Sequence, residues 1–421
     1  MGYYKKLLIE MEERGNWPVG LEDKYVCASH FNDIYLQKKV RSDGVAGVCS
    51  YCGKKRQVAN MQRLGEFIAL KIHMSYNDVN DAGLFYADDF FEEDEDYGTV
   101  PGFKKFCNYV VPNDAECYDS TADLLSELGA DVDNDELQKD IEDIFTTQEW
   151  VSRDLLVTEK REVRMNDLWM KFSDMVKSHR RFTFLAEPSF LEILTGPKDR
   201  YAGEDKNILT VLDDLIKQME LLTVLQPEDV MLYRSRKEDK IDVAYGFNDI
   251  TSPPDKSAFN NRMSPAGISM FYASFDKNTA KGECVGEDTA GILVGTFRPK
   301  RQLRVIDLTA IPTKISFWMD YFQESIFLRE FNKQVTKSID PKEKSIEYIP
   351  TQVLIEYFRY MFKDSRKRPI DGVIYGSSKE AKNKNIVLFC DQKSSSEYVE
   401  LSGPLELYTK KWVKTRDDKV V

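Results

Sequence analysis

The sequence predicts an α+β protein, in which an N-terminal zinc-binding and helical region precedes a mixed α/β region. Three observations predict this fold class: two pairs of metal-ligand residues within the first 60 residues, amphipathic helical patterns up to about residue 225, and short β-type runs thereafter. A chain of 421 residues is also too long for one ordinary hydrophobic core. We therefore predict a zinc-binding segment at 1–60, an acidic helical domain at 61–225 and a mixed α/β domain at 226–421.

The zinc-binding segment is predicted from four residues in two short-spaced pairs. These are Cys27, His30, Cys49 and Cys52. Each pair is separated by two residues, so a short turn presents both ligands to one point, and four protein ligands saturate a tetrahedral zinc ion. Gly53 directly after the last cysteine suits a tight metal-binding turn. Because no coordination position stays open for water or substrate, we expect a structural zinc site.

Other histidines and cysteines are weaker candidates for the metal. His73, Cys107 and Cys117 are spare ligands, but a lone histidine among apolar residues is more often a core residue. The cysteine count is odd, at seven, and three cysteines lie close together near the N-terminus. This distribution favours metal binding in a reducing compartment over a disulfide framework.

The helical domain is predicted from apolar residues at helical spacing. One set is Leu168, Phe172, Met175, Val176 and His179, and a second is Ile208, Val211, Leu212, Leu215, Ile216, Met219 and Leu222. The second set ends near Pro227, which stops a helix and places a domain boundary near residue 225. In the run 88–96, seven of nine residues are acidic, and we interpret it as a solvated loop.

The mixed α/β domain is predicted from short runs of β-forming residues. Strands are expected at 230–234, 268–273, 291–297, 303–308, 372–375 and 385–389. Between them, Val353, Leu354, Tyr357, Phe358 and Met361 lie at helical spacing and predict an interposed helix. The strands should form a compact twisted sheet.

Composition and charge exclude several functional classes. With 42% hydrophobic and 12% aromatic residues, the chain can bury sizeable cores. Its net charge of −12 argues against non-specific attraction to nucleic acid or to an anionic membrane. No uncharged apolar run approaches the roughly eighteen residues that span a bilayer, and the first residues resemble no signal peptide. We therefore expect a cytoplasmic protein with no membrane partner and no clear nucleic-acid partner.

The mixed α/β domain carries arginine, glutamate, tyrosine and serine at strand edges, but no histidine. All three histidines of the chain precede residue 180, so no His-dependent triad can form in this domain. The planar guanidinium group of arginine makes paired, charge-assisted hydrogen bonds to phosphate oxygens. The domain is therefore expected to bind a phosphate-bearing ligand.

Several motifs in order then resemble a known family. LYRSR, NRMSPAGISMFYAS, the glutamate of AKGEC, DGVIYGSS and NIVLF are similar to the ordered motif series of RES domains. The N-terminal part, with its cysteine pairs and the segment Trp169 to Phe184, is similar to the HEPN/RES N-terminal domain of some bacterial proteins.

The resemblance implies a fold similar to that of ADP-ribosyltransferases and an NAD-consuming toxin activity, with NAD as substrate. It implies five catalytic residues: Arg234, Arg262, Tyr272, Glu283 and Ser377. All of these except Glu283 would also bind NAD. Many relatives have Gly-Arg and a nearby Asn where this chain has Asn261-Arg262 and Ser264, which leaves the loop contacts open. Two neighbours remain alternatives, Arg236 for the first arginine and Ser378 for the serine, whereas Cys284 and Cys390 are interpreted as small hydrophobic residues.

Three functions follow from this interpretation. The first is an NAD glycohydrolase or NAD phosphorylase, toxin-like or defence-related, that cleaves the nicotinamide–ribose bond. The second is an ADP-ribosyltransferase acting on a protein or nucleic acid, although no Glu-x-Glu or Gln-x-Glu pair lies beyond Glu228. The third is a non-catalytic, zinc-bearing recognition module. RES domains occur in toxin–antitoxin modules, so an antitoxin or regulatory protein and a homodimer are expected partners.

Overall fold

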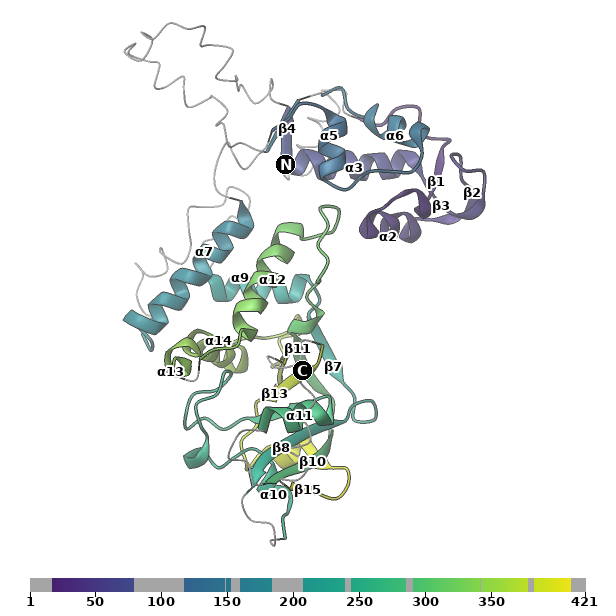
Figure 1. Cartoon of the computed structure of the whole chain (residues 1–421). Coiled ribbons are helices and arrows are strands. Elements are labelled where there is room, and N and C mark those ends of the chain that lie inside the picture. The colour runs from purple at the N-terminus through teal and green to yellow at the C-terminus, as the bar shows by residue number, and fades with distance from the viewer. Residues whose placement is uncertain are drawn as a thin grey trace, which may run out of the picture. The chain divides into compact units, whose positions relative to one another are not determined.

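The structure is a computed structural model that describes residues 17–78, 117–147, 149–152, 160–183, 207–238, 244–284, 291–340, 342–377 and 382–409. The chain forms two compact units (Figure 1). The first comprises Met1–Arg161 and Lys314–Gln323, and the second comprises Glu162–Thr313 and Glu324–Val421. The acidic run at 88–96, Cys107 and Ser378 lie outside the described residues.

The first unit contains two small antiparallel sheets and four α-helices among its described residues. Its elements are β1 (Tyr25–Cys27), η1 (Ala28–His30), α2 (Ile34–Ser42), β2 (Val45–Val48), β3 (Lys55–Asn60), α3 (Met61–Ser75), β4 (Tyr76–Asp78), β5 (Cys117–Tyr118), α5 (Thr121–Glu127), α6 (Asp135–Glu142) and β6 (Trp150–Ser152). The strand orders are β1-β3-β2 and β4-β6-β5.

Polar N-cap residues begin the helices of the first unit. Asp33 accepts hydrogen bonds from two backbone N–H groups at the start of α2, and Asn60 accepts one at the start of α3. Ser120 and Asn134 cap α5 and α6 in the same way. These side chains satisfy N–H groups that have no partner within the helix, which fixes where each helix starts.

A segment from the C-terminal half of the sequence completes the core of the first unit. Trp318 is only 2% exposed, and its indole Nε1 donates a hydrogen bond to the carbonyl oxygen of Leu128 at 2.7 Å. The Phe317 ring lies 6.1 Å from the ring of Tyr76. Lys71 Nζ donates to the carbonyl oxygen of Met319 at 2.9 Å. The ten residues 314–323 are therefore an integral part of this unit.

The second unit contains a curled mixed sheet with helices. Its strands are β7 (Leu222–Leu225), β8 (Leu232–Glu238), β9 (Phe271–Ser274), β10 (Gly291–Pro299), β11 (Leu303–Asp307), β12 (Gly372–Gly376), β13 (Lys384–Leu388), β14 (Val399–Leu401) and β15 (Glu406–Thr409). Its helices are α7 (Arg161–Asp174), the π-helical η6 (Met175–His179), α9 (Ile208–Gln218), α10 (Phe247–Ile250), η8 (Asp255–Ser257), α11 (Lys277–Cys284), η9 (Leu308–Ala310), α12 (Phe322–Thr336), α13 (Lys344–Glu347), α14 (Ile349–Tyr360) and α15 (Ser395–Tyr398).

The sheet order is β14-β10-β8-β9-β13-β12-β11-β7, with β15 also paired to β10. Of these pairs, β11 and β12 run parallel and the others antiparallel. Alternate residues face opposite sides of a strand, so Val387 enters the core cluster shared with α7, α9, α12 and α14, while Ile386 and Leu388 enter a second cluster. In Figure 1 these helices gather at one end of the unit, with β8, β10 and β15 at the other.

The structure confirms most predicted elements of the mixed α/β region. Each of the six predicted strands overlaps one of β8 to β13, and the interposed helix is α14. The helix predicted through Leu222 is wrong at its end: α9 stops at Gln218, Glu220 has a φ of 53°, and Leu222 begins β7. Pairing of Leu222 with Ile306 of β11 overrides the helical spacing there.

The predicted domain boundary near residue 225 stays a prediction. Helices α7 and α9 belong to the second compact unit, and β7 belongs to its sheet. Of the helices that the structure describes, none has the length and apolar character needed to cross a membrane.

Candidate functional site

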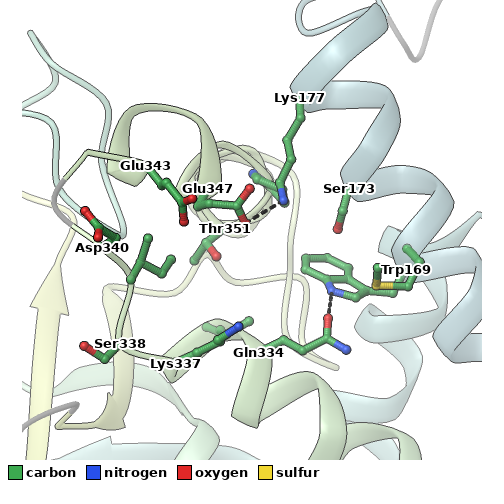
Figure 2. Close-up of a pocket in the computed structure, with 14 residues that line it drawn as sticks. Trp169, Ser173, Lys177, Gln334, Lys337, Ser338, Asp340, Glu343, Glu347 and Thr351 are labelled. Carbon is green, nitrogen blue, oxygen red and sulfur yellow. Dashed lines mark hydrogen bonds and ion pairs between the residues drawn. The ribbon is translucent and has the colours of Figure 1, made fainter.

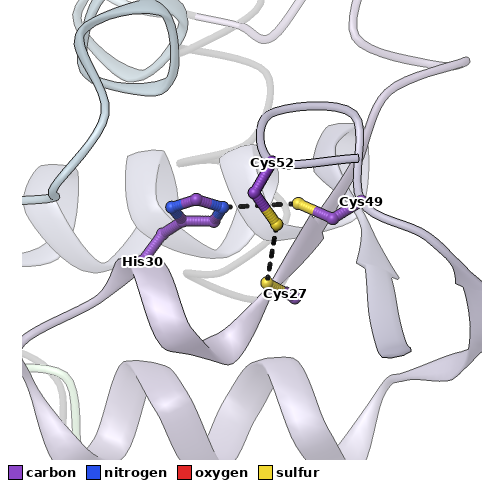
Figure 3. Close-up of side chains that lie close together, drawn as sticks. All are labelled: Cys27, His30, Cys49 and Cys52. Atoms are coloured by element: carbon purple, nitrogen blue, oxygen red, sulfur yellow. Dashed lines mark hydrogen bonds between the residues drawn. The ribbon is translucent and has the colours of Figure 1, made fainter. Parts of the chain in front are cut away.

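The four predicted metal ligands converge on one point of the first unit (Figure 3). Cys27 ends β1, His30 ends η1, and Cys49 and Cys52 lie in the turn between β2 and β3. Their ligand atoms all lie within 4.8 Å of one another, and three of the four residues are buried. The prediction that these residues form one cluster is confirmed.

The spacing of the ligand atoms fits a tetrahedral ion. Bonds of the usual length to zinc separate two sulfurs by about 3.8 Å, and a sulfur from an imidazole nitrogen by about 3.6 Å. Cys27 Sγ lies 3.8 Å from Cys52 Sγ, and Cys49 Sγ lies 3.4 Å from His30 Nε2. The cluster therefore requires little rearrangement to hold zinc.

Two further features support this geometry. His30 Nδ1 lies 2.5 Å from Asp133 Oδ1, a contact that orients the ring and keeps Nε2 available as a ligand. Gly53 has a φ of +68°, the left-handed conformation expected for the turn, and its N–H donates to the Cys49 carbonyl at 2.9 Å. His73, by contrast, is 1% exposed and packs beside Phe145, as expected of a core residue.

The predicted catalytic residues lie in the second unit, and Arg234 is held in the middle of its sheet. The half-buried side chain extends from β8, where Nε donates to the Ile250 carbonyl at 2.8 Å and Nη1 to the Tyr272 carbonyl at 2.7 Å. Its guanidinium lies 5.4 Å from the centre of the Phe271 ring. Burial lowers the pKa of Arg234 below its ordinary value. No carboxylate of the described residues forms an ion pair with it.

The neighbouring Arg236 differs from Arg234 in its exposure and in having a carboxylate partner. It is exposed, and its Nη2 lies 3.5 Å from Glu238 Oε2. Its Nη1 donates to the carbonyl oxygen of Asp249 at 2.7 Å. Among the described residues, the half-buried Arg234 thus lacks the carboxylate partner that the exposed Arg236 has.

Arg262 is held by the carbonyl groups at the end of α12. Its Nη1 donates to Val335 at 2.5 Å and its Nη2 to Lys337 at 2.6 Å. The guanidinium also lies 5.2 Å from the centre of the Tyr348 ring. Within the described parts of the chain it pairs with no carboxylate. No hydrogen bond joins it to the other four predicted residues.

Burial raises the pKa values of two tyrosines of the sheet, Tyr272 of β9 and Tyr375 of β12. Tyr272 OH lies 2.8 Å from Ser264 Oγ, and burial raises the Tyr272 pKa well above its ordinary value. The pKa of Tyr375 is also raised, first by burial and then by neighbouring Tyr272 and Glu283, while Arg262 lowers it. Both phenols are thus protonated at neutral pH.

The Glu283 carboxylate is held by two side-chain donors. It extends from the end of α11, where Oε1 accepts a hydrogen bond from Ser377 Oγ at 3.0 Å and another from Asn385 Nδ2 at 3.1 Å. Ser377 and Asn385 are buried, whereas Glu283 is exposed. Its second oxygen, Oε2, has no hydrogen-bond donor among the described residues. The structure therefore brings Glu283 and Ser377 together.

A cavity of about 330 Å³ lies elsewhere in the second unit (Figure 2). None of the five predicted residues lines it. Trp169 Nε1 donates to Gln334 Oε1 at 2.8 Å on one wall, and Lys177 pairs with Glu347 at 2.7 Å on another. Val335 and Lys337, whose carbonyls hold Arg262, also line it. The cavity thus borders the segment that orients this arginine.

Three residues near the predicted groups were not identified from the sequence. Asn385 opens the NIVLF strand, Tyr375 closes GVIY, and Tyr348 precedes α14. Strand alternation places Asn385 on the same face as Val387, whose partner across the strands is Tyr272. A polar residue in an apolar strand was the available signal for Asn385. Of the cysteines interpreted as hydrophobic residues, Cys390 is fully buried, which raises the pKa of its thiol to about 11.

Comparison with known protein families gives two matches, whereas a search of curated proteins finds none. The family model described as HEPN/RES N-terminal domain 1 matches residues 42–190, and that described as RES domain matches residues 228–408. The second range contains all five predicted catalytic residues. A RES domain implies an NAD-related, toxin-like enzymatic function in general terms. The chain therefore belongs to the RES-domain proteins that carry a HEPN/RES N-terminal domain.

Proposed function

We propose that this protein is an NAD-consuming enzyme of the NAD glycohydrolase or NAD phosphorylase type, which cleaves the nicotinamide–ribose bond. The observation that carries the proposal is a pair of arginines without carboxylate partners among the described residues, together with a glutamate held by two side-chain donors. A bacterial toxin or defence role and a fold similar to ADP-ribosyltransferases accord with RES-family membership.

The arginines are proposed to bind the pyrophosphate of NAD. A desolvated cation is costly unless an anion or hydrogen-bond acceptors compensate it. Arg234 uses two of its five N–H donors on carbonyl groups, and three remain for phosphate oxygens. Arg262 likewise uses two N–H donors on carbonyl groups and keeps three for phosphate oxygens. Arg236 already has a carboxylate within 3.5 Å, so Arg234 is the better candidate for the first arginine.

Glu283 is proposed to stabilise the transition state. When the bond from ribose C1′ to the nicotinamide nitrogen breaks, its electron pair leaves with nicotinamide and positive charge develops on the ribose. A carboxylate fixed beside that charge lowers its energy. Water or phosphate then bonds to C1′ and releases a proton. Tyr272 would stack on a ring of NAD and Ser377 would hydrogen-bond near the sugar, in addition to holding Glu283.

The direct test is incubation of the full-length protein with NAD, with and without phosphate. Release of free ADP-ribose identifies water as the acceptor, and release of a phosphorylated ADP-ribose identifies phosphate. NAD labelled in its adenylate part tests the alternative ADP-ribosyltransferase function, because a transferase would leave the label on a protein or nucleic acid. If the protein binds NAD but neither consumes it nor transfers label, both enzymatic functions fail and the non-catalytic recognition module remains.

We further propose that the cluster of Cys27, His30, Cys49 and Cys52 holds a structural zinc ion. The donor set, the 3.8 Å separation of two sulfurs and the contact of His30 with Asp133 support this assignment. Four protein ligands leave no site for substrate, so the ion would stabilise the first unit and take no part in NAD chemistry. Elemental analysis of purified protein should find one zinc per chain.

The remaining expectations are also proposals. A cytoplasmic location, an antitoxin or regulatory protein as partner and assembly as a homodimer follow from the resemblance to RES toxins. Co-expression with candidate antitoxins and measurement of solution mass would test the two partners.

A further inference from the structure

The side-chain amide of Asn385 is buried, and its nitrogen and oxygen atoms have different surroundings. It lies on β13 between Ser274 of β9 and Tyr375 of β12, and is 7% exposed. Its Nδ2 donates to Glu283 Oε1 at 3.1 Å. Its Oδ1 is buried and accepts no hydrogen bond from the described residues.

The orientation of this amide is set by Glu283. Rotating the amide by half a turn would place Oδ1 against the carboxylate oxygen, where two acceptors repel, and would leave Nδ2 without an acceptor. A buried acceptor without a partner destabilises a fold, and an apolar β-branched side chain suits a buried strand position better. Fold stability alone therefore does not favour asparagine at 385.

The hydrogen bond matters because Glu283 is an exposed side chain with several rotatable bonds. Ser377 supplies one donor to Oε1, and a single bond leaves the carboxylate free to pivot. The donor from Asn385 comes from the interior of the sheet and removes that freedom. Both donors bind Oε1, and Oε2 accepts no hydrogen bond from the described residues.

We propose that Asn385 is a positioning residue for NAD cleavage. It holds the Glu283 carboxylate in its reactive direction, although an apolar residue at this position would make the fold more stable. The inference rests on the proposed function of Glu283. It adds a residue that acts through the glutamate and touches no reacting atom.

The first test is Asn385→Val in the full-length protein. We expect a melting temperature at or above that of wild type, a Kd for NAD within threefold, and a fall in kcat of about 10- to 100-fold because the carboxylate is misdirected. A residue with a purely structural role would lower the melting temperature instead. Turnover at the wild-type rate, or a loss of activity that follows a loss of folded protein, overturns the inference.

The matched control is Asn166→Leu in helix α7. Asn166 also has a buried Oδ1 without a partner among the described residues, but the side-chain hydrogen bonds of Glu283 go to Ser377 and Asn385 instead. This variant should match or exceed the wild-type melting temperature and keep the wild-type kcat. A comparable loss of kcat in the control would show that removing any such amide impairs activity, and would overturn the specific role of Asn385.

A second measurement does not depend on NAD. In a Glu283→Ala background, Nδ2 of Asn385 has also lost its partner, so Asn385→Val should raise the melting temperature more than it does in wild type. Equal effects in the two backgrounds overturn the proposed link between the side chains. If wild type fails to consume NAD while the effects differ, the proposed function fails and the link between Asn385 and Glu283 stands.

Discussion

Replacing Glu283 with glutamine removes one negative charge and little else. Glutamine keeps a carbonyl oxygen that can accept the hydrogen bonds from Ser377 and Asn385, so the local geometry should persist. What is lost is attraction to the positive charge on ribose. At a separation of about 4 Å and an effective dielectric constant of about 20, this attraction amounts to roughly 4 kcal/mol. Such a loss lowers kcat by about 10³-fold.

The assay separates binding from chemistry. Nicotinamide release gives kcat, and calorimetric titration gives the Kd for NAD, which should stay within threefold because Arg234 and Arg262 are unchanged. Glu400→Gln is the control, since Glu400 pairs with Arg298 on the exposed edge of the sheet at 2.6 Å. A Glu283→Gln variant with kcat within threefold of wild type would refute the charge argument. Loss of NAD binding with kcat intact would move Glu283 from catalysis to binding.

Three further predictions concern the arginines, the metal and the inserted segment. Arg234→Lys should raise the Kd for NAD by about 10- to 100-fold, because lysine cannot replace the fork of donors, whereas calorimetry on Arg236→Lys should show little change. Asp133→Asn should weaken zinc binding by about 10- to 100-fold in a competition with a chelator, and zinc removal should unfold the first unit before NAD turnover falls. Unaltered zinc affinity would exclude a role for Asp133. Trp318→Ala should lower the free energy of unfolding by roughly 3–5 kcal/mol in urea titrations, and a loss below 1 kcal/mol would contradict its place in the core.

The sequence predicted the strands of the second unit well because their apolar runs are short and bounded by turns. It failed at Leu222, where α9 gives way to β7. Helical spacing persists through that residue, and only its partner on β11, distant in sequence, settles the conformation. Such long-range pairing leaves no local signal.

The metal cluster was predictable because ligand spacing within each pair is a local property. Asp133 was not, since it reaches His30 from more than 100 residues away. Similarly, Glu283 and Ser377 were identified from family motifs, whereas Asn385 required knowledge of which strand lies beside which. Phe317 and Trp318 lie in an ordinary apolar run, and no feature of the neighbouring sequence assigns them to the first unit.

The inserted segment has a practical consequence for dissecting this protein. The backbone passes between the two units at three places: Arg161–Glu162, Thr313–Lys314 and Gln323–Glu324. A truncated protein that begins at residue 226 would present Phe317 and Trp318 to water with no core to receive them, and would lack α7 and α9. Such a fragment should aggregate whatever its catalytic competence. Chimaeras between relatives must therefore exchange residues 314–323 together with the N-terminal region, because these two separate stretches of sequence form one folded unit.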